Sequence, residues 1–213
     1  MNKSTNLILL VAGILVLGSG IYFSLYRHPV HTLPYFGEKV PGTHGDTTYH
    51  SVSDFSLTDQ QGRTITQNNL KGKIYVAAYF FANCKTICPK MSSQLERVQY
   101  KFRNEPTFMI LSHTVDPVRD TVAAMARYAS MHGADPAKWL FLTGDKKQLY
   151  DLARHSYISV ASVGNGGPDD FVHTDQFALV DKEKHLRGFY DGTDSLEVNR
   201  LITDVEQLLL SYK

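Results

Sequence analysis

Along the chain, continuous apolar runs that are typical of strands alternate with apolar residues at helical spacing. Each change from one pattern to the other predicts a new element. The run 73–81 is dense in β-branched and aromatic residues and is typical of a buried strand. Leu95, Val98 and Phe102 then recur at helical spacing, which predicts a helix from Pro89 to about residue 103. The same alternation predicts further strands at 107–112, 139–142, 176–180 and 186–190, and helices at 118–131, 146–155 and 196–210.

Two short strands precede this series. Residues 55–58 and 63–66 flank Asp59-Gln60-Gln61-Gly62, a turn sequence that predicts a hairpin. Strands that alternate with helices, together with a closing hairpin, indicate an α/β fold in which helices flank a mixed central sheet. The chain has 213 residues, of which 43% are apolar and 20% charged, so one globular domain with an appendage is expected.

The appendage is the N-terminal segment. Residues 7–26 contain no charged residue, and such a run is about long enough to cross a bilayer as one helix. We therefore expect residues 1–26 to be a single-pass membrane anchor. Lys3 favours a cytoplasmic N-terminus, which puts the globular domain on the periplasmic side of the inner membrane. A cleaved signal peptide is the alternative, because Gly18-Ser19-Gly20 resembles a cleavage site.

Residues 27–51 have no usable periodicity and are rich in proline and glycine, so they predict a flexible linker before a domain at 52–213. This linker holds four histidines, which are either solvated or part of a secondary metal site: His28, His31, His44 and His50. The net charge is +1 and the sequence has no basic stripe, so nucleic acid is not an expected partner.

The two cysteines of the chain, Cys84 and Cys88, lie where the buried strand runs into a helix. Pro89 suits the first turn of that helix. Unpaired N–H groups at the helix N-terminus, together with Lys85, favour thiolate, which is both a nucleophile and a soft metal ligand. Positions i and i+4 share a helix face, so both sulfurs can point at one ion. Two buried structural cysteines and a structural disulfide remain alternatives.

A third ligand is sought among nine histidines. His173 is the best placed, in a loop just before the expected strand 176–180 and after a Gly-rich segment. Its alternative is polar surface. A thiol pair that follows a central strand at a helix start is also where a thioredoxin-like fold carries its active cysteines.

Three segments in this order resemble the Sco/SenC family. They are Cys84-xxx-Cys88-Pro89 after a strand, Val115-Asp-Pro-Val-Arg-Asp-Thr121, and His173 before an apolar strand that is followed by Tyr190-Asp-Gly-Thr193. The resemblance covers roughly residues 52–211. It implies a membrane-anchored protein with a thioredoxin-like fold that helps to deliver copper to the binuclear copper site of cytochrome c oxidase.

The resemblance also implies the roles of individual residues. Cys84 and Cys88 correspond to the two thiolate ligands of copper, and His173 to the imidazole ligand. Such a set suits Cu(I) and can hold Cu(II), although zinc accepts the same ligand types. The implied partners are a copper donor and a copper-receiving protein such as cytochrome c oxidase subunit II. Asp116 and Asp120 match the family's aspartates, and we expect them to serve the turn and the helix cap rather than the metal. The alternative is a role in docking or in supporting the metal ligands.

The chain departs from the family pattern in two places. Many members have proline after the first cysteine, where this chain has Lys85. The histidine is often preceded by aspartate, whereas Val172 stands here and Asp175 lies nearby. The first departure affects thiolate basicity or docking, and the second puts an acidic helper for His173 in doubt.

Three functions compete. A metallochaperone, which need not be an enzyme, would hold copper on Cys84, Cys88 and His173 and lose it to a partner by ligand exchange. A thiol-disulfide reductase would use Cys84 or Cys88 as a redox-active pair to keep a partner's copper-ligand cysteines reduced. A peroxidase-like enzyme lacks support, because the position three residues before Cys84 is Phe81 rather than threonine.

Overall fold

The computed structural model describes residues 12–19, 32–41, 47–159, 172 and 174–212. The chain forms two units, Met1–His31 and Thr32–Lys213, and each is considered by itself. In the first unit the described residues 12–19 are helical and exposed. Within the described parts of the chain, no helix combines the length and the apolar character that crossing a membrane requires. Most of the expected anchor, 1–26, lies outside those parts.

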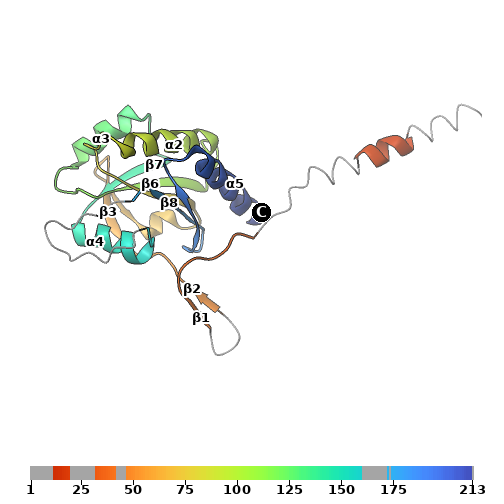
Figure 1. The fold of residues 1–213 in the computed structure, drawn as a ribbon, viewed down its shortest axis with the longest axis horizontal. Helices are drawn as coiled ribbons and strands as arrows, with labels where there is room; N and C mark the ends of the chain where they lie inside the picture. Colours follow the sequence, from red (N-terminus) through yellow and green to blue (C-terminus); the bar gives the residue numbers. More distant parts are fainter. Residues whose placement is uncertain (1–11, 20–31, 42–46, 160–171, 173, 213) are drawn as a thin grey trace, which may run out of the picture. The chain divides into compact units, whose positions relative to one another are not determined.

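A seven-stranded mixed sheet forms the centre of the second unit (Figure 1). Its order is β4-β3-β7-β6-β5-β8-β9. The central strands β5, β6 and β7 are parallel, and the outer pairs are antiparallel. The strands are β3 (Ser56–Asp59), β4 (Thr64–Thr66), β5 (Ile74–Phe80), β6 (Phe108–Thr114), β7 (Trp139–Thr143), β8 (Gln176–Val180) and β9 (Leu186–Asp191). The sequence prediction of a mixed sheet is confirmed.

Strand β5 is buried on both faces along its whole length, which explains its continuous apolar sequence. Val76 and Ala78 face a core shared with the helices on one side, while Ala77 and Tyr79 face a second core on the other. The first core is covered by α2 (Ile87–Lys101), α3 (Val122–Met131) and α5 (Ser195–Ser211). The second is covered by α4 (Lys146–Asp151) and a π-helical turn, Leu152–Ser156. Helices therefore flank the sheet on both faces, as predicted.

The predicted hairpin is confirmed at β3 and β4, which pair Leu57 with Ile65. Asp59 closes its turn, because its carboxylate accepts N–H bonds from Gln61 at 2.8 Å and Arg63 at 2.9 Å. Gly62 has a φ of +78°, a conformation that favours glycine. A short 3₁₀ helix, Gln67–Leu70, leads from this hairpin into β5.

Two helix starts test the predicted boundaries. Helix α5 begins at Ser195, one residue before its predicted start, and Asp194 caps it by accepting from the Leu196 N–H. The helix predicted at 118–131, however, begins at Val122 rather than Val118, and its cap is Thr121, which accepts from the Ala124 N–H. The physical reason is a separate turn before the helix, in which the Asp120 N–H donates to the Asp116 carbonyl at 2.9 Å.

Part of the expected linker has hydrogen-bonded structure of its own. A two-stranded hairpin, β1 (Lys39–Pro41) and β2 (Thr47–Tyr49), lies within it (Figure 1). Before the hairpin, the Arg187 guanidinium donates to the carbonyls of Leu33 and Pro34, at 2.5 and 3.1 Å, and lies 4.0 Å from the Tyr35 ring centroid. The same guanidinium pairs with the buried Asp181 at 2.8 Å. We call residues 33–36 the strap.

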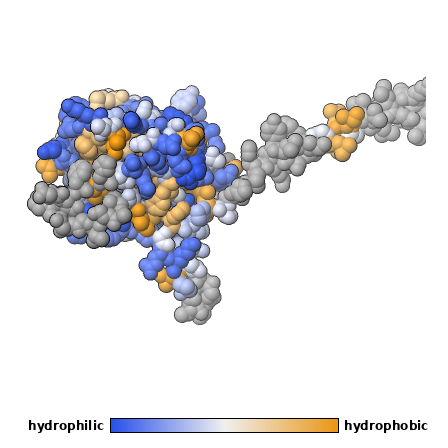
Figure 2. Space-filling model, viewed as in Figure 1, coloured by the Kyte–Doolittle hydropathy of each residue, from blue (hydrophilic) through white to orange (hydrophobic). Residues whose placement is uncertain are grey.

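The visible surface of the second unit is mostly polar, with hydrophobic residues in small scattered groups (Figure 2). Few large apolar side chains are strongly exposed among its described residues. Three that are more than two-thirds exposed lie on helices, namely Tyr100, Met131 and Leu196, and a fourth, Val118, lies on the turn before α3.

Candidate functional site

The thiols lie at the carboxyl end of β5, where the chain turns into α2. Cys84 is in the loop, and its N–H donates to the Phe81 carbonyl at 3.1 Å. Cys88 is in the first turn of α2, and its N–H donates to the Cys84 sulfur at 3.4 Å. Helix α2 has no side-chain cap from Thr86, so the Cys84 sulfur satisfies one of the free N–H groups of the first turn. Both thiols are free and buried.

The two thiols have opposite acidities. Burial raises the pKa of Cys84, but hydrogen bonds from the Cys88 thiol, the Cys88 N–H and Thr86 outweigh it and lower this pKa to about 7. Burial raises the pKa of Cys88 to about 12, and the Cys84 sulfur, which accepts the Cys88 proton, adds to that increase. Cys84 is therefore about half ionised at neutral pH, whereas Cys88 remains a thiol. The prediction of thiolate at the helix start applies to one cysteine only.

Asp120 fastens the turn before α3 to the thiol loop. Both of its carboxylate oxygens accept from the Ala82 N–H at 3.2 Å, and one accepts from the Thr114 hydroxyl at 2.5 Å. Burial raises the pKa of Asp120. The expected helix-cap role is wrong for Asp120, because Thr121 is the cap and the Asp120 side chain points to the thiol loop instead.

Asp116 serves the turn, as expected. Its carbonyl accepts from the N–H groups of Arg119 and Asp120, at 3.1 and 2.9 Å, and its own N–H donates to the Thr114 hydroxyl at 2.9 Å. Its carboxylate pairs with Arg119 at 3.4 Å. Thr114 therefore holds both ends of this turn at the end of β6.

Sequence reasoning missed a pair of hydroxyls beside the thiols. Tyr128 on α3 and Ser92 on α2 are 2.9 Å apart and buried. Burial raises the pKa of Tyr128 to about 12, and the nearby charges of Cys88, Cys84 and Asp120 raise it further. Ser92 lies four residues after Cys88, so its helical position was the available signal; nothing in the sequence points to Tyr128.

His173, the expected imidazole ligand, lies outside the described residues. Its neighbours in the chain, Val172 and Thr174, line a small cavity of about 10 Å³ together with Cys88, Ile87 and Val115. Of the remaining histidines, His113 is buried on β6 and stacked on Tyr79, with ring centroids 5.3 Å apart. Burial lowers the pKa of His113 to about 3, so it is a neutral core residue.

The described part of the chain brings Cys84 and Cys88 together but contains no cluster of three or more His, Cys, Asp or Glu side chains that could hold a metal ion. The Asp116 carboxylate pairs with Arg119, and the Asp120 carboxylate accepts from Thr114 and Ala82. The thiol pair is thus the chemically distinctive feature of this region. It can supply two sulfur ligands or one nucleophile with a resolving thiol.

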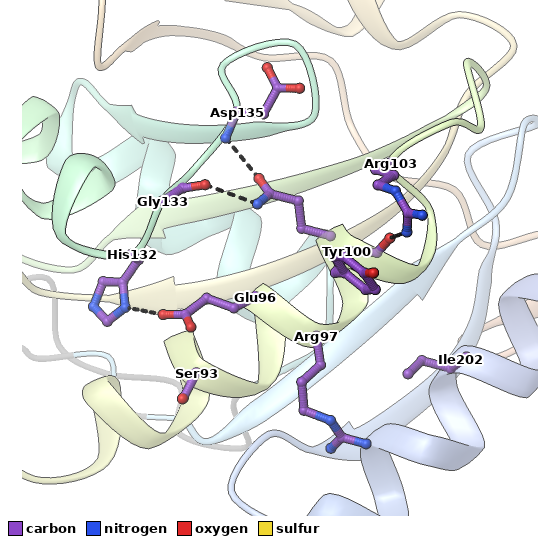
Figure 3. A pocket seen from close by; sticks show the side chains of 10 residues that line it. Ser93, Glu96, Arg97, Tyr100, Arg103, His132, Gly133, Asp135 and Ile202 are labelled. Carbon is purple, nitrogen blue, oxygen red and sulfur yellow. Dashed lines mark hydrogen bonds and ion pairs between the residues drawn. The ribbon is translucent and has the colours of Figure 1, made fainter.

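A larger groove of about 770 Å³ lies away from the thiols (Figure 3). The second half of α2 forms its floor, and the turn after α3 forms one wall, where His132 contacts Glu96 at 2.7 Å. Gln99 joins the two by bonding to the backbone of Gly133 and Asp135. The groove contains no thiol, so we do not assign the chemistry to it.

Comparison with known proteins gives one family. The family model described as SCO1/SenC matches residues 43–210. The SCO1 protein homolog of Bacillus subtilis is 28% identical over 163 residues, which are 76% of this chain and 84% of that protein. The mitochondrial SCO2 homolog of Bos taurus is 33% identical over 151 residues, 68% of this chain but only 55% of that protein.

Solved structures agree with the fold. BsSco, described as a member of the Sco family of cytochrome c oxidase assembly proteins with a disulfide switch, is 27% identical with a TM-score of 0.64, over 75% of this chain and 93% of that one. Yeast Sco1 with copper bound is 25% identical with a TM-score of 0.55, over 75% of this chain and 94% of that one. The predicted thioredoxin-like α/β fold is confirmed.

Proposed function

This chain belongs to the SCO1/SenC family, and we propose that it binds copper through Cys84, Cys88 and His173 and passes the ion to a copper-receiving protein, such as subunit II of cytochrome c oxidase. In this proposal copper is a cargo, and the ion leaves the chain by ligand exchange. Two relatives support this proposal. The structure of yeast Sco1 has been solved with copper bound, and BsSco is a member of a family of cytochrome c oxidase assembly proteins.

The observation that carries the proposal is the state of the thiol pair. About half of the Cys84 sulfurs are thiolate at neutral pH, because the pKa of Cys84 is about 7. A soft cation at Cys84 displaces the Cys88 proton that the sulfur now accepts, so that both sulfurs become ligands. Since binding releases this proton, copper affinity increases with pH.

The support for His173 comes from its neighbours in the chain. Val172 and Thr174 line the same cavity as Cys88, which favours His173 over the other histidines as the third ligand. An imidazole nitrogen would complete a three-ligand set of two sulfurs and one nitrogen. The softness of two thiolates favours Cu(I), while the imidazole extends the site to Cu(II).

The second candidate function is thiol-disulfide reduction, and one observation favours it. The pKa difference between Cys84, about 7, and Cys88, about 12, is the asymmetry that an attacking thiolate and a resolving thiol need. In that reaction Cys84 attacks a partner disulfide, one partner thiolate leaves, and Cys88 then loses its proton and displaces the second. The chain ends with a Cys84–Cys88 disulfide and the partner with two thiols.

We also propose that residues 1–26 anchor the chain in the inner membrane, with the globular domain on the periplasmic side. The support is the uncharged run 7–26 between Lys3 and Arg27. Thiol pairs can oxidise to disulfides in the periplasm, so the redox state of Cys84 and Cys88 would control copper binding there.

Replacement of His173 with Ala separates the two functions. Both sulfurs and the start of α2 remain, so thiol-disulfide exchange with a model substrate should persist at nearly the wild-type rate. Copper retention should decrease, most for Cu(II), since imidazole is the harder donor. The measurements are copper content, reduction of the model disulfide and oxidase assembly in cells that carry each variant.

The outcomes assign the function. If assembly fails while thiol exchange persists, metal carriage is the role of the protein. Normal assembly by the His173→Ala variant, with copper content unchanged, would exclude His173 as a ligand and leave the reductase function as the account of the thiol pair.

A further inference from the structure

Val118 is the most exposed large hydrophobic residue among those that the structure describes in Thr32–Lys213, with 83% of its surface accessible. It lies between Pro117 and Arg119 in the turn that precedes α3. An exposed valine on a surface is ordinary by itself. Val118 differs from an ordinary surface valine because its turn is fixed by hydrogen bonds and lies next to the thiol loop.

The turn that carries Val118 is held at both ends. The Asp120 N–H closes it on the Asp116 carbonyl at 2.9 Å, and the Thr114 hydroxyl binds the Asp116 N–H and the Asp120 carboxylate. Asp120 is only 1% exposed. Val118 is therefore presented on a rigid support, which reduces the entropy that a partner must remove on binding.

This turn lies against the thiol loop. The Val115 N–H donates to the Phe80 carbonyl at 2.9 Å, and the Ala82 N–H donates to Asp120. Phe80 ends β5 and Ala82 stands two residues before Cys84. The turn that carries Val118 and the loop that leads to Cys84 are therefore neighbours in the fold.

The segments that carry the thiols and Val118 are basic. Lys85 and Lys90 are exposed, and neither has a carboxylate partner among the described residues. Arg119 is 77% exposed and has only the partly covered Asp116 beside it, at 3.4 Å. Residues 81–92 contain no acidic residue, and in 114–123 the second acid, Asp120, is buried.

From these observations we propose that Val118 is an apolar contact that enters a recess on the copper-receiving protein, and that this recess is bordered by carboxylates which face Lys85, Lys90 and Arg119. Charge complementarity selects an acidic protein domain as the partner. The inference rests on the proposed function, since it concerns the protein that takes the copper. Docking brings acceptor ligands beside Cys84 and Cys88, and Cu(I) then moves from two thiolates to the acceptor without a change of oxidation state.

The test measures Cu(I) transfer from the full-length protein in detergent to two acceptors, the soluble copper-binding domain of oxidase subunit II and a small Cu(I) chelator. Val118→Asp should slow transfer to the domain by about tenfold or more, the size typical of a central contact. It should leave transfer to the chelator unchanged, because the proposed copper ligands are not altered. Val118→Ile should behave as wild type.

Met131→Asp is the matched control. Met131 is 71% exposed at the far end of α3, so this variant introduces the same charge elsewhere on the same helix region and should not change either rate. Equal rates for wild type and Val118→Asp with the protein acceptor would overturn the proposal. So would an equal slowing with both acceptors, because the effect would then lie in the metal site.

Charge is tested separately. Lys90→Glu should slow transfer to the domain, whereas Lys71→Glu, on the turn at the opposite end of β5, should not. Raising salt from about 0.05 M to about 0.5 M should remove most of that difference. No effect of Lys90→Glu or of salt would contradict an acidic partner.

Failure of the proposed function is distinguishable from failure of this inference. If the wild-type protein holds no copper, the copper proposal fails, and docking is then measured directly as binding of the reduced, metal-free protein to the immobilised domain. Weaker binding by Val118→Asp but not by Met131→Asp still supports the contact. Equal binding by all three proteins rejects it.

Discussion

At the scale of single residues, the chemistry depends on how two similar thiols become different. The Cys84 sulfur accepts hydrogen bonds from the Cys88 thiol, the Cys88 N–H and Thr86, whereas the Cys88 sulfur is more deeply buried and gives its proton away. The sequence predicts that this corner favours thiolate, because helix starts and lysine do so in general. It does not predict which sulfur ionises, since that depends on burial and on the direction of one hydrogen bond.

We expect the alkylation rate of Cys84 by iodoacetamide to rise with pH around a midpoint near 7, because its thiolate forms there. Cys88 should react slowly up to at least pH 9, since its pKa is about 12. In the Cys88→Ala variant, Cys84 loses the thiol donor, and its midpoint should move above 7. Mass spectrometry of peptides from reduced protein, alkylated across a pH series, measures each site.

The Cys84→Ala variant is the control for this experiment, because the remaining thiol stays buried and should remain slow. A midpoint for Cys84 near 9 in the wild type, equal to that of an ordinary thiol, would contradict the described geometry. A faster reaction at Cys88 than at Cys84 would reverse the assignment of attacking and resolving thiols.

At the scale of elements, predictions succeeded where the hydrophobic period was unbroken. Strand β5 and helix α2 were predicted almost residue by residue, because one is wholly apolar and the other is amphipathic with proline in its first turn. The start of α3 was predicted four residues early. Val118 suits a helix as a residue type. The chain is held in a turn there, however, because the Asp120 carboxylate accepts hydrogen bonds from the Thr114 hydroxyl and from the N–H of Ala82, which is distant in sequence.

The strap was predicted to be part of a linker, because nothing in its own sequence indicates that it binds Arg187. Leu33 and Pro34 contribute only backbone carbonyls, and their donor is Arg187, far along the chain. Arg187 sits at the start of β9 and pairs with the buried Asp181. A proline-rich segment with no period thus gains its order from a long-range contact that no local pattern encodes.

Arg187→Ala should release the strap and destabilise the domain by about 3 kcal/mol, because it leaves the buried Asp181 carboxylate without its cation. Hydrogen exchange at Phe36, whose N–H donates to the Leu186 carbonyl, should become faster than in wild type. Lys101→Ala, which removes a half-exposed pair with Glu206, should change stability little. Unchanged protection at Phe36 in Arg187→Ala would show that the arginine does not hold the strap.

At the scale of the whole molecule, the fold class, the thiol corner and the family followed from the sequence, because strand-helix alternation and the three motifs are local patterns. The sequence did not predict which residues of β5, β6, α2 and α3 surround the thiols. Tyr128 and Thr114 are examples. The contact of Ser92 with Tyr128 and that of Ala82 with Asp120 join residues that are 36 and 38 positions apart in the chain. The same distance explains why the presentation of Val118 on a fixed turn has no signature in the sequence.

The proposed anchor belongs to this scale as well. The full-length protein should sediment with membranes and resist carbonate extraction, since residues 7–26 are uncharged and about long enough to span the bilayer. Protease added from the periplasmic side should reach the globular domain. Recovery of a soluble protein that begins near Ile21 would identify the segment as a cleaved signal peptide.

The central claim is that Cys84 and Cys88 form a copper site, and competitive metal analysis tests it most directly. The full-length protein is purified in detergent, reduced under anaerobic conditions, offered copper and zinc together, and analysed for both metals after removal of excess. We predict about one copper per chain with little zinc, because soft thiolates prefer Cu(I). Oxidation to the Cys84–Cys88 disulfide, or the double substitution Cys84→Ser and Cys88→Ser, should abolish copper binding. Preferential retention of zinc, or equal copper in the reduced, oxidised and doubly substituted proteins, would contradict the account.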